Sequence, residues 1–400
     1  MRCNLVMAHP IGHNAGQPTR EKNVKIVVAP DSYKESLSAL DVATEIEAGL
    51  KQALPHATVI KVPVADGGEG TVQAMVDATG GHYESRTVTG PLGQPVEARF
   101  ALLGDGSTAV VEMAEASGLH LVTPEQRDPR ITTTYGTGEL IRAALDLGVR
   151  HLILGLGGSA TNDGGTGMVQ ALGAQLLDTE GQPLPRGGAA LADLARIDTR
   201  HLDPRLGQLT VEVACDVDNP LCGPKGASAI FGPQKGATEA VVAELDAALN
   251  HYAECLLQQL GQDVAHVPGA GAAGGMGAAA LAFFGATLRP GIEIVLDTVG
   301  LDKHLEGADL VITGEGRIDS QTIHGKTPMG VAKRAKALGL PVIGLAGSLS
   351  DDVDVVHDHG IDAVFSILPR PMTLEEALVN ARPFLRQAAR NVAALYTLRR

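Results

Sequence analysis

Short apolar runs alternate with helical patterns at the beginning of the chain. Val24 to Ala29 is a short, mainly apolar run, which predicts a buried strand. The following apolar positions recur at helical spacing: Leu37, Leu40, Ala43, Ile46 and Leu50. A second unit has a strand over Val59 to Val64 and a helix from Thr71 that ends at Gly80. Two consecutive βα units predict a parallel sheet.

The pattern changes in the middle of the chain. Between Glu84 and Met113, short β-like runs are separated by turn residues at 90–93 and 104–107, which predicts an antiparallel meander. Mixed α/β structure follows. We expect helices over 138–147 and 238–260, strands over 151–156 and 209–215, and a Gly/Ala-rich stretch over 268–280 that forms a backbone nest or a closely packed helix.

The βα rhythm returns after Gly291, with predicted strands over 292–296, 310–313, 342–346 and 363–367. We therefore predict an α/β protein with a discontinuous Rossmann/flavodoxin-like parallel-sheet domain, formed by 24–81 plus 288–400. A second α/β domain, 82–287, is inserted into it. Residues 1–23 show no helical or strand period, and we interpret them as a disordered or over-called N-terminal extension.

Composition narrows the function classes. The 400 residues are 44% hydrophobic, which excludes a disordered chain, and 5 Tyr, 6 Phe and no Trp do not suit an aromatic platform for single-stranded nucleic acid. The net charge is −14 without a long basic block, so we expect no nucleic-acid or membrane partner. No apolar run is long enough to span a bilayer. The four cysteines show no CxxC pair, which is typical of reduced thiols in the cytoplasm.

Polar and glycine residues follow four of the predicted parallel strands. They occupy 31–34, 66–70, 314–319 and 347–348. Ligands of open parallel sheets bind beyond the carboxyl ends of the strands. One such loop is explained equally well by ordinary turn chemistry, but four on one edge indicate a functional site.

Two of the loops offer oxygen ligands of the kind that Mg²⁺ prefers. Asp66 and Glu69 flank Gly67 and Gly68, whose backbone can approach an anion closely; alternatively, Asp66 caps the helix that starts near Thr71. The segment 216–219, Asp-Val-Asp-Asn, is either a ligand cluster or an Asx turn, and we favour the turn slightly.

The segment 155–165 is the second glycine-rich feature. With Asp178 it matches the spacing of a dinucleotide-binding fingerprint, which favours a nicotinamide-dependent oxidoreductase. However, Gly164 and Gly165 would interrupt the helix that this fingerprint requires, so a broader anion-binding nest fits better. The segment 320–327 is a near-miss of a P-loop that we reject, although Lys326 can still hold a phosphate or be a solvated residue at a helix start.

These motifs together resemble the bacterial type I glycerate kinases, over nearly the whole chain from Val24. The resemblance rests on six ordered segments: 29–37, 65–71, 157–165, 216–221, 269–275, and 313–319 followed by Gln321, Thr322, Gly325 and Lys326. The chain departs from the family at Tyr33, where Phe is usual, and at Glu35, where Gly is common.

The resemblance implies ATP-dependent phosphorylation of D-glycerate, most often to 2-phosphoglycerate, in a cleft between two α/β domains. The sequence does not determine the oligomeric state, and a homo-oligomer is one of the alternatives. Phosphoryl transfer requires Mg²⁺, charge neutralisation and a carboxylate near the attacking hydroxyl. The expected nucleotide-binding residues are Gly157, Gly158, Ser159, Asn162, Gly67 and Gly68, and the expected magnesium ligands are Asp66 and Asp163.

We expect Arg317, Ser32 and Glu315 to bind glycerate and Lys34 and Lys326 to stabilise the transferring charge. Asp319 is the expected base, with Asp31 as the alternative. Two other functions are weighed against this one: the nicotinamide-dependent oxidoreductase acting on a small hydroxy acid, and a non-catalytic regulator that binds a sugar acid.

Overall fold

The computed structural model describes residues 24–68 and 70–398. The predictions made for residues 1–23 and for Glu69 therefore lie outside the described residues. Within the described ranges, no helix is long and apolar enough to cross a membrane.

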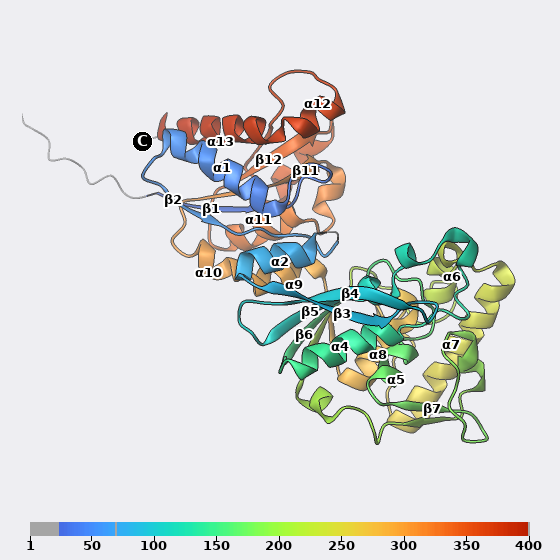
Figure 1. Ribbon diagram of the computed structural model, residues 1–400. Helices are drawn as coiled ribbons and strands as arrows, with labels where there is room; N and C mark the ends of the chain where they lie inside the picture. Colours follow the sequence, from blue (N-terminus) through green and yellow to red (C-terminus); the bar gives the residue numbers. More distant parts are fainter. Residues whose placement is uncertain (1–23, 69, 399–400) are drawn as a thin grey trace, which may run out of the picture.

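A five-stranded parallel sheet joins the two ends of the chain, as predicted. Its order is β13–β12–β11–β1–β2, so strands from the beginning and the end of the sequence lie side by side (Figure 1). Their bounds are β1 (Lys25–Pro30), β2 (Thr58–Lys61), β11 (Leu310–Ile318), β12 (Val342–Leu349) and β13 (Ala363–Ser366). Every neighbouring pair in this sheet is parallel.

Helices cover both faces of the parallel sheet. One face carries α1 (Ala39–Ala53) and α13 (Ala381–Leu398), which pack against each other (Figure 1). The other face carries α2 (Thr71–Thr79), α9 (Gly291–Thr298), α10 (Leu301–Leu305) and α11 (Thr327–Ala337). The helix starts and stops follow local chemistry: Ser38 caps α1 by accepting from Asp41 N, and Gly80 ends α2 in the left-handed region.

The second sheet has six strands in the order β10–β9–β6–β5–β4–β3. The meander of β3 (His82–Thr89), β4 (Pro95–Leu102) and β5 (Thr108–Glu112) is antiparallel, as predicted. The other strands, β6 (His151–Gly155), β9 (Thr210–Ala214) and β10 (Thr287–Arg289), run parallel to β5. The structure is thus an α/β protein with a second, mixed sheet inserted between the two halves of the parallel one.

Helices also cover the outer face of the mixed sheet. They are α3 (Ala114–Ser117), α4 (Tyr135–Asp146), α5 (Thr166–Ala171) and α8 (Ala272–Phe284). A satellite core beyond them joins α6 (Ala227–Phe231) and α7 (Glu239–Leu260) to a two-stranded sheet of β7 (Gln175–Leu177) and β8 (Arg196–Asp198).

Two expectations near the site were wrong. Residues 292–296 form helix α9 instead of a strand. Ile292 and Val295 share one core with Val110 and Ile153 of the mixed sheet, so this helix is buried between the two sheets. Four of the five residues over 292–296 are apolar, and such a short run does not distinguish a buried helix from a buried strand. The second error concerns 314–318 and 347–348, which extend β11 and β12 instead of forming loops.

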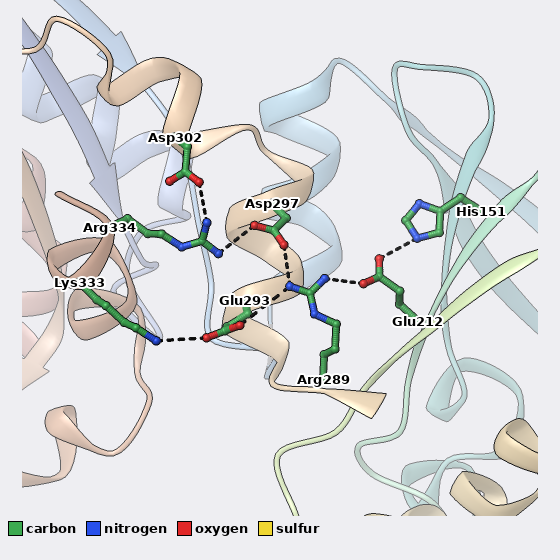
Figure 2. A network of polar contacts seen from close by, with 8 residues as sticks. All are labelled: His151, Glu212, Arg289, Glu293, Asp297, Asp302, Lys333 and Arg334. Carbon is green, nitrogen blue, oxygen red and sulfur yellow. Dashed lines mark hydrogen bonds and ion pairs between the residues drawn. The ribbon is translucent and has the colours of Figure 1, made fainter. Parts of the chain in front are cut away.

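An ion network connects the two sheets where the chain crosses from β10 to α9 (Figure 2). Arg289, at the end of β10, donates to Glu212 of β9 at 2.5 Å and to Asp297 of α9 at 2.6 Å. Arg334 of α11 donates to Asp297 at 2.8 Å, and His151 of β6 contacts Glu212 at 2.8 Å. The network links β6, β9 and β10 of the mixed sheet to two helices of the parallel-sheet layer.

Candidate active site

A cavity of about 1030 Å³, the larger of the two that contain the predicted site residues, lies between the sheets. Its walls come from loops at the carboxyl ends of β2, β6, β9 and β11, which is where ligands of parallel sheets bind. The polar lining includes Asp66, Gly67, Gly68, Gly157, Gly158, Ser159, Asp216, Asp218, Gln234, His324 and Lys326. The apolar lining includes Leu156, Val217, Phe231, Pro290 and Ile292.

The smaller cavity, of about 500 Å³, belongs to the parallel sheet. It is lined by the loops after β1 and β13, by the ends of β11 and β12, and by helix α12 (Leu374–Val379). Its polar residues are Asp31, Ser32, Lys34, Glu35, Ser36, Asp66, Glu315, Arg317, Asp319, Lys326 and Ser348. Asp66 and Lys326 line both cavities and therefore stand where the two meet.

Most of the residues selected from the sequence line these cavities. Gly67, Gly68, Gly157, Gly158 and Ser159 line the larger one. Asp31, Ser32, Lys34, Glu315, Arg317 and Asp319 line the smaller one. Asn162 and Asp163 line neither, because both are fully buried.

The Asp163 carboxylate is buried and accepts hydrogen bonds from neighbouring segments. Its Oδ2 accepts from Thr134 N at 2.8 Å and from Thr134 Oγ1 at 2.9 Å, and its Oδ1 accepts from Gly165 N at 3.1 Å. Burial raises the pKa of this carboxyl. Asn162 is likewise used internally, since its Nδ2 donates to Ser228 Oγ at 2.9 Å. The geometry therefore gives no support to Asp163 as a magnesium ligand or to Asn162 as a nucleotide contact.

Asp66 does not cap α2, contrary to the alternative considered from the sequence. The N-cap is Gly70, which offers no side chain, and Asp66 Oδ1 instead accepts from Gly68 N at 3.0 Å in a local turn. Asp216 faces the same cavity and accepts from Gly291 N at 2.9 Å, so it is not engaged in a local Asx turn. Burial, and then the charge of Asp66, raise the pKa of Asp216.

Asp66 and Asp216 are residues of the larger cavity that suit a magnesium ion. The described residues contain no group of three His, Cys, Asp or Glu side chains that could hold a metal. Mg²⁺ is usually bound by one or two carboxylates together with substrate phosphates and waters. Two carboxylates on the wall of a cavity beside a glycine-rich loop are such a donor set.

The carboxylates of the smaller cavity are perturbed by burial. Burial raises the pKa of Glu315 to about 7. Two contacts act in the opposite direction: Thr322 Oγ1 donates to Oε1 at 2.7 Å, and Lys326 Nζ lies 3.9 Å from Oε2. Burial also raises the pKa of Asp31, against the hydrogen bond of 2.6 Å that Thr327 Oγ1 donates to it. Proton acceptors with raised pKa values at a cavity are typical of functional sites.

Asp319 is already occupied by local partners. Its Oδ1 accepts from Gln321 N at 3.0 Å and lies 3.7 Å from Lys326 Nζ. Its Oδ2 lies 3.3 Å from Arg317 Nε. Arg317 itself is exposed, with 65% of its side chain accessible, so its guanidinium is free to turn toward an anion in the smaller cavity.

The loop after β6 is not a dinucleotide fingerprint. Helix α5 begins only at Thr166, well beyond the point where that motif requires it, and β7, which precedes Asp178, pairs only with β8 in a separate sheet. Gly274, with φ +68, lies so close to this loop that a Cβ there would be 2.0 Å from Thr161 O. The 268–280 stretch is therefore a kinked, closely packed helix start that supports the loop.

Sequence reasoning missed several residues of the larger cavity and one directly behind it. Phe231, Gln234 and His324 line the cavity wall. Lys235 is buried and donates to Ser159. The available signal was a charged residue between two glycines, Gly232 and Gly236, but nothing in the sequence shows which distant loop such a lysine meets.

The arrangement is that of an α/β phosphotransferase. A glycine-rich loop and an acidic pair line one cavity, and a second polar cavity adjoins it. Comparison with known proteins gives the family. The model of the glycerate kinase family matches residues 26–397. The chain belongs to the glycerate kinase family.

Individual relatives agree with this membership. The chain is 59% identical over 371 residues to a glycerate 2-kinase of Escherichia coli (strain K12), covering 93% of this chain and 97% of that protein. It is 58% identical over 371 residues to a glycerate kinase of Bacillus subtilis (strain 168), with coverage of 93% and 97%. A crystal structure from Salmonella typhimurium LT2, assigned as glycerate kinase 2, superposes with a TM-score of 0.87 at 58% identity, covering 94% of this chain and 99% of that chain.

Proposed function

We propose that this protein is a glycerate kinase that transfers the γ-phosphoryl group of ATP to the 2-hydroxyl of D-glycerate, with Mg²⁺. The names of the relatives support the reaction and its position. The three described cysteines are free thiols, which suits an enzyme of the reducing cytoplasm.

One observation carries the proposal: Asp66 and Lys326 line both cavities. Phosphoryl transfer requires the donor and the acceptor to meet in line, with charge neutralised at the point of transfer. A nucleotide in the larger cavity and glycerate in the smaller one would meet between these two residues. The carboxylate of Asp66 suits a magnesium ion, and the ammonium group of Lys326 suits the oxygens of the transferring phosphoryl group.

The remaining roles follow from this placement. The loop with Gly157, Gly158 and Ser159 approaches the phosphates, and Asp66 with Asp216 holds Mg²⁺, which would neutralise phosphate charge when bound. Arg317 pairs with the glycerate carboxylate, for which a bidentate guanidinium suits. Ser32 and Glu315 complete the acceptor cavity, and Lys34 reaches it from the loop after β1.

For the base, the geometry favours Asp31 over Asp319. Asp319 is paired with two cations, Arg317 and Lys326, which stabilise its charged form. The groups that donate to Asp31, from Ser32 and Thr327, are neutral. Asp31 lines the smaller cavity, and burial raises its pKa, which makes it the better proton acceptor. We expect Asp31→Asn to lower kcat by about 100-fold or more with little change in ATP binding. A larger loss in Asp319→Asn than in Asp31→Asn would reverse the assignment.

Phosphorus NMR of the protein with MgATP and D-glycerate tests the function directly. A phosphomonoester resonance should appear together with ADP and should be absent without enzyme or without glycerate. Coupling of that phosphorus to one proton identifies 2-phosphoglycerate, and coupling to two identifies 3-phosphoglycerate. Intact ATP in the presence of folded protein would refute glycerate as the acceptor, and binding of NADH without binding of ATP would support the oxidoreductase instead.

A further inference from the structure

A buried lysine lies behind the glycine-rich loop of the larger cavity. Lys235 ends the short 3₁₀ helix Pro233–Lys235 and is 1% exposed. Its Nζ donates to Ser159 Oγ at 2.8 Å and to the carbonyl oxygen of Thr161 at 2.7 Å. The ammonium group is therefore held against the inner side of the loop and does not reach solvent.

This ammonium group has no ion-pair partner in the described part of the chain. The charge of Asp163 acts on it without an ion-pair contact, and the oxygens of Asp163 accept from Thr134, Gly165 and Gly167. A buried charge is costly unless it is paired. Burial accordingly lowers the pKa of Lys235 to about 7. The loop it contacts is open on its other side to the larger cavity, so a bound anion is the available counter-charge.

The contact also fixes the direction of the Ser159 hydroxyl. An ammonium group has donors only, so Ser159 Oγ accepts from Lys235 whenever the lysine is protonated, and a bound anion favours that form. The hydroxyl hydrogen of Ser159 remains to be donated, and no acceptor for it is recorded among residues 24–68 and 70–398. Ser159 lines the larger cavity beside Gly157 and Gly158. A ligand atom next to it must therefore be an acceptor, and an anionic oxygen gains most.

We propose that Lys235 positions the phosphate groups of the nucleotide in the larger cavity, by holding Ser159 as a hydrogen-bond donor and by supplying a buried charge that the polyphosphate neutralises. The inference rests on the proposed function, because it takes the larger cavity to be the nucleotide site. Lys235 touches the loop and not the nucleotide, so it is a positioning residue. The ligand class it selects is a chain of phosphates, whatever base is attached.

Calorimetric binding of ATP, tripolyphosphate and adenosine to the full chain, in the presence of Mg²⁺, separates this role from a structural one. Three variants are compared: Lys235→Met, Ser159→Ala and, as a matched control, Lys225→Met, whose side chain is exposed and lines neither cavity. Loss of a charge-assisted hydrogen bond is expected to weaken ATP and tripolyphosphate binding by about 10- to 100-fold in Lys235→Met. Adenosine binding and the KM for glycerate should stay within about two-fold of wild type, as should all values for the control.

Several outcomes would overturn the proposal. Equal weakening of adenosine and tripolyphosphate binding would make Lys235 a structural residue, and unchanged ATP binding would remove it from the site. If Lys235→Met does not fold, Ser159→Ala decides: tripolyphosphate binding as tight as in wild type refutes the role of the pair. If the wild type binds tripolyphosphate but not ATP, the nucleotide function fails while Lys235 keeps its role. A wild type that binds neither refutes both.

Discussion

The buried carboxyl group of Glu315 predicts that the stability of the protein depends on pH. Its side chain is 13% exposed, and burial raises its pKa from 4.5 to about 7. At about 1.4 kcal/mol per pH unit, this rise corresponds to roughly 3 kcal/mol by which the folded protein disfavours the ionised form. Replacement by Gln removes the charge and keeps an oxygen that can accept the hydrogen bond from Thr322 Oγ1.

The sign of the effect follows from proton binding. Above about pH 4.5 the unfolded chain loses the Glu315 proton, whereas the folded protein keeps it until about pH 7. The folded state therefore binds more protons in this interval, and the free energy of unfolding falls as pH rises through it. Glu315→Gln should match wild type near pH 4 and exceed it by about 2–3 kcal/mol near pH 8.

Urea unfolding followed by far-UV circular dichroism, at pH values from about 4 to 8, measures this difference; the chain has no Trp to report by fluorescence. Glu180→Gln, in an exposed turn, is the control for loss of a carboxylate as such. A difference between Glu315→Gln and wild type that stays constant across the pH range would refute the reasoning, because a raised pKa requires a slope.

Three further substitutions test the geometry of the larger cavity and its support. Gly157→Ala adds a Cβ with no neighbour within 4 Å, so stability should be unchanged while KM for ATP rises by about 10-fold; unaltered kinetics would mean that no ligand approaches this loop. Asp66→Asn should lower kcat by at least about 100-fold and raise the Mg²⁺ concentration needed for half-maximal rate, and an unchanged metal requirement would exclude Asp66 as a ligand. Gly274→Ala would place a Cβ 2.0 Å from Thr161 O at φ +68, and we expect a loss of about 3 kcal/mol in urea unfolding. Gly207→Ala, which meets nothing within 4 Å, is its control, and equal stability of the two variants would contradict the close packing.

The parallel sheet and its ligand-binding edge could be predicted because local signals and topology agree there. The β1–α1 unit is marked by an apolar run and by Ser38 at the helix start, and α2 ends at the glycine where the pattern stops. Once the strands are known to be parallel, the loops after them must share one edge. This rule alone places Asp31, Asp66 and Glu315 together, although they are far apart in sequence.

Burial at the site could not be predicted in the same way. Asp163 lies in a glycine-rich motif that matches the family, yet it faces inward and is bound by backbone N–H groups of α5 and by Thr134. Motif membership does not determine which side of a loop a side chain takes, since this depends on elements packed from elsewhere. Lys235 shows the same limit, because its partner Ser159 lies in a distant loop.

Two departures from the family pattern have structural consequences that the sequence alone does not reveal. Glu35, where Gly is common, adopts φ 61, in the left-handed region that glycine occupies without cost. Tyr33, where Phe is usual, is buried and satisfies its additional hydroxyl by donating to the Leu345 carbonyl at 2.9 Å. The first difference adds local strain beside the smaller cavity, and the second is accommodated without an unpaired polar group.

The position of the acidic pair explains why the site needs both sheets. Asp66 follows β2 of the parallel sheet, and Asp216 follows β9 of the mixed sheet. Both line the larger cavity, and the crossover from β10 to α9 passes close to each of the two loops: Gly291 N donates to Asp216, and a Cβ on Gly67 would lie 2.9 Å from Gly291 Cα. Only glycines allow this approach of two backbones. Any change in the angle between the sheets must therefore alter the separation of Asp66 and Asp216, so an ion bound by both would hold the two halves of the site in one arrangement.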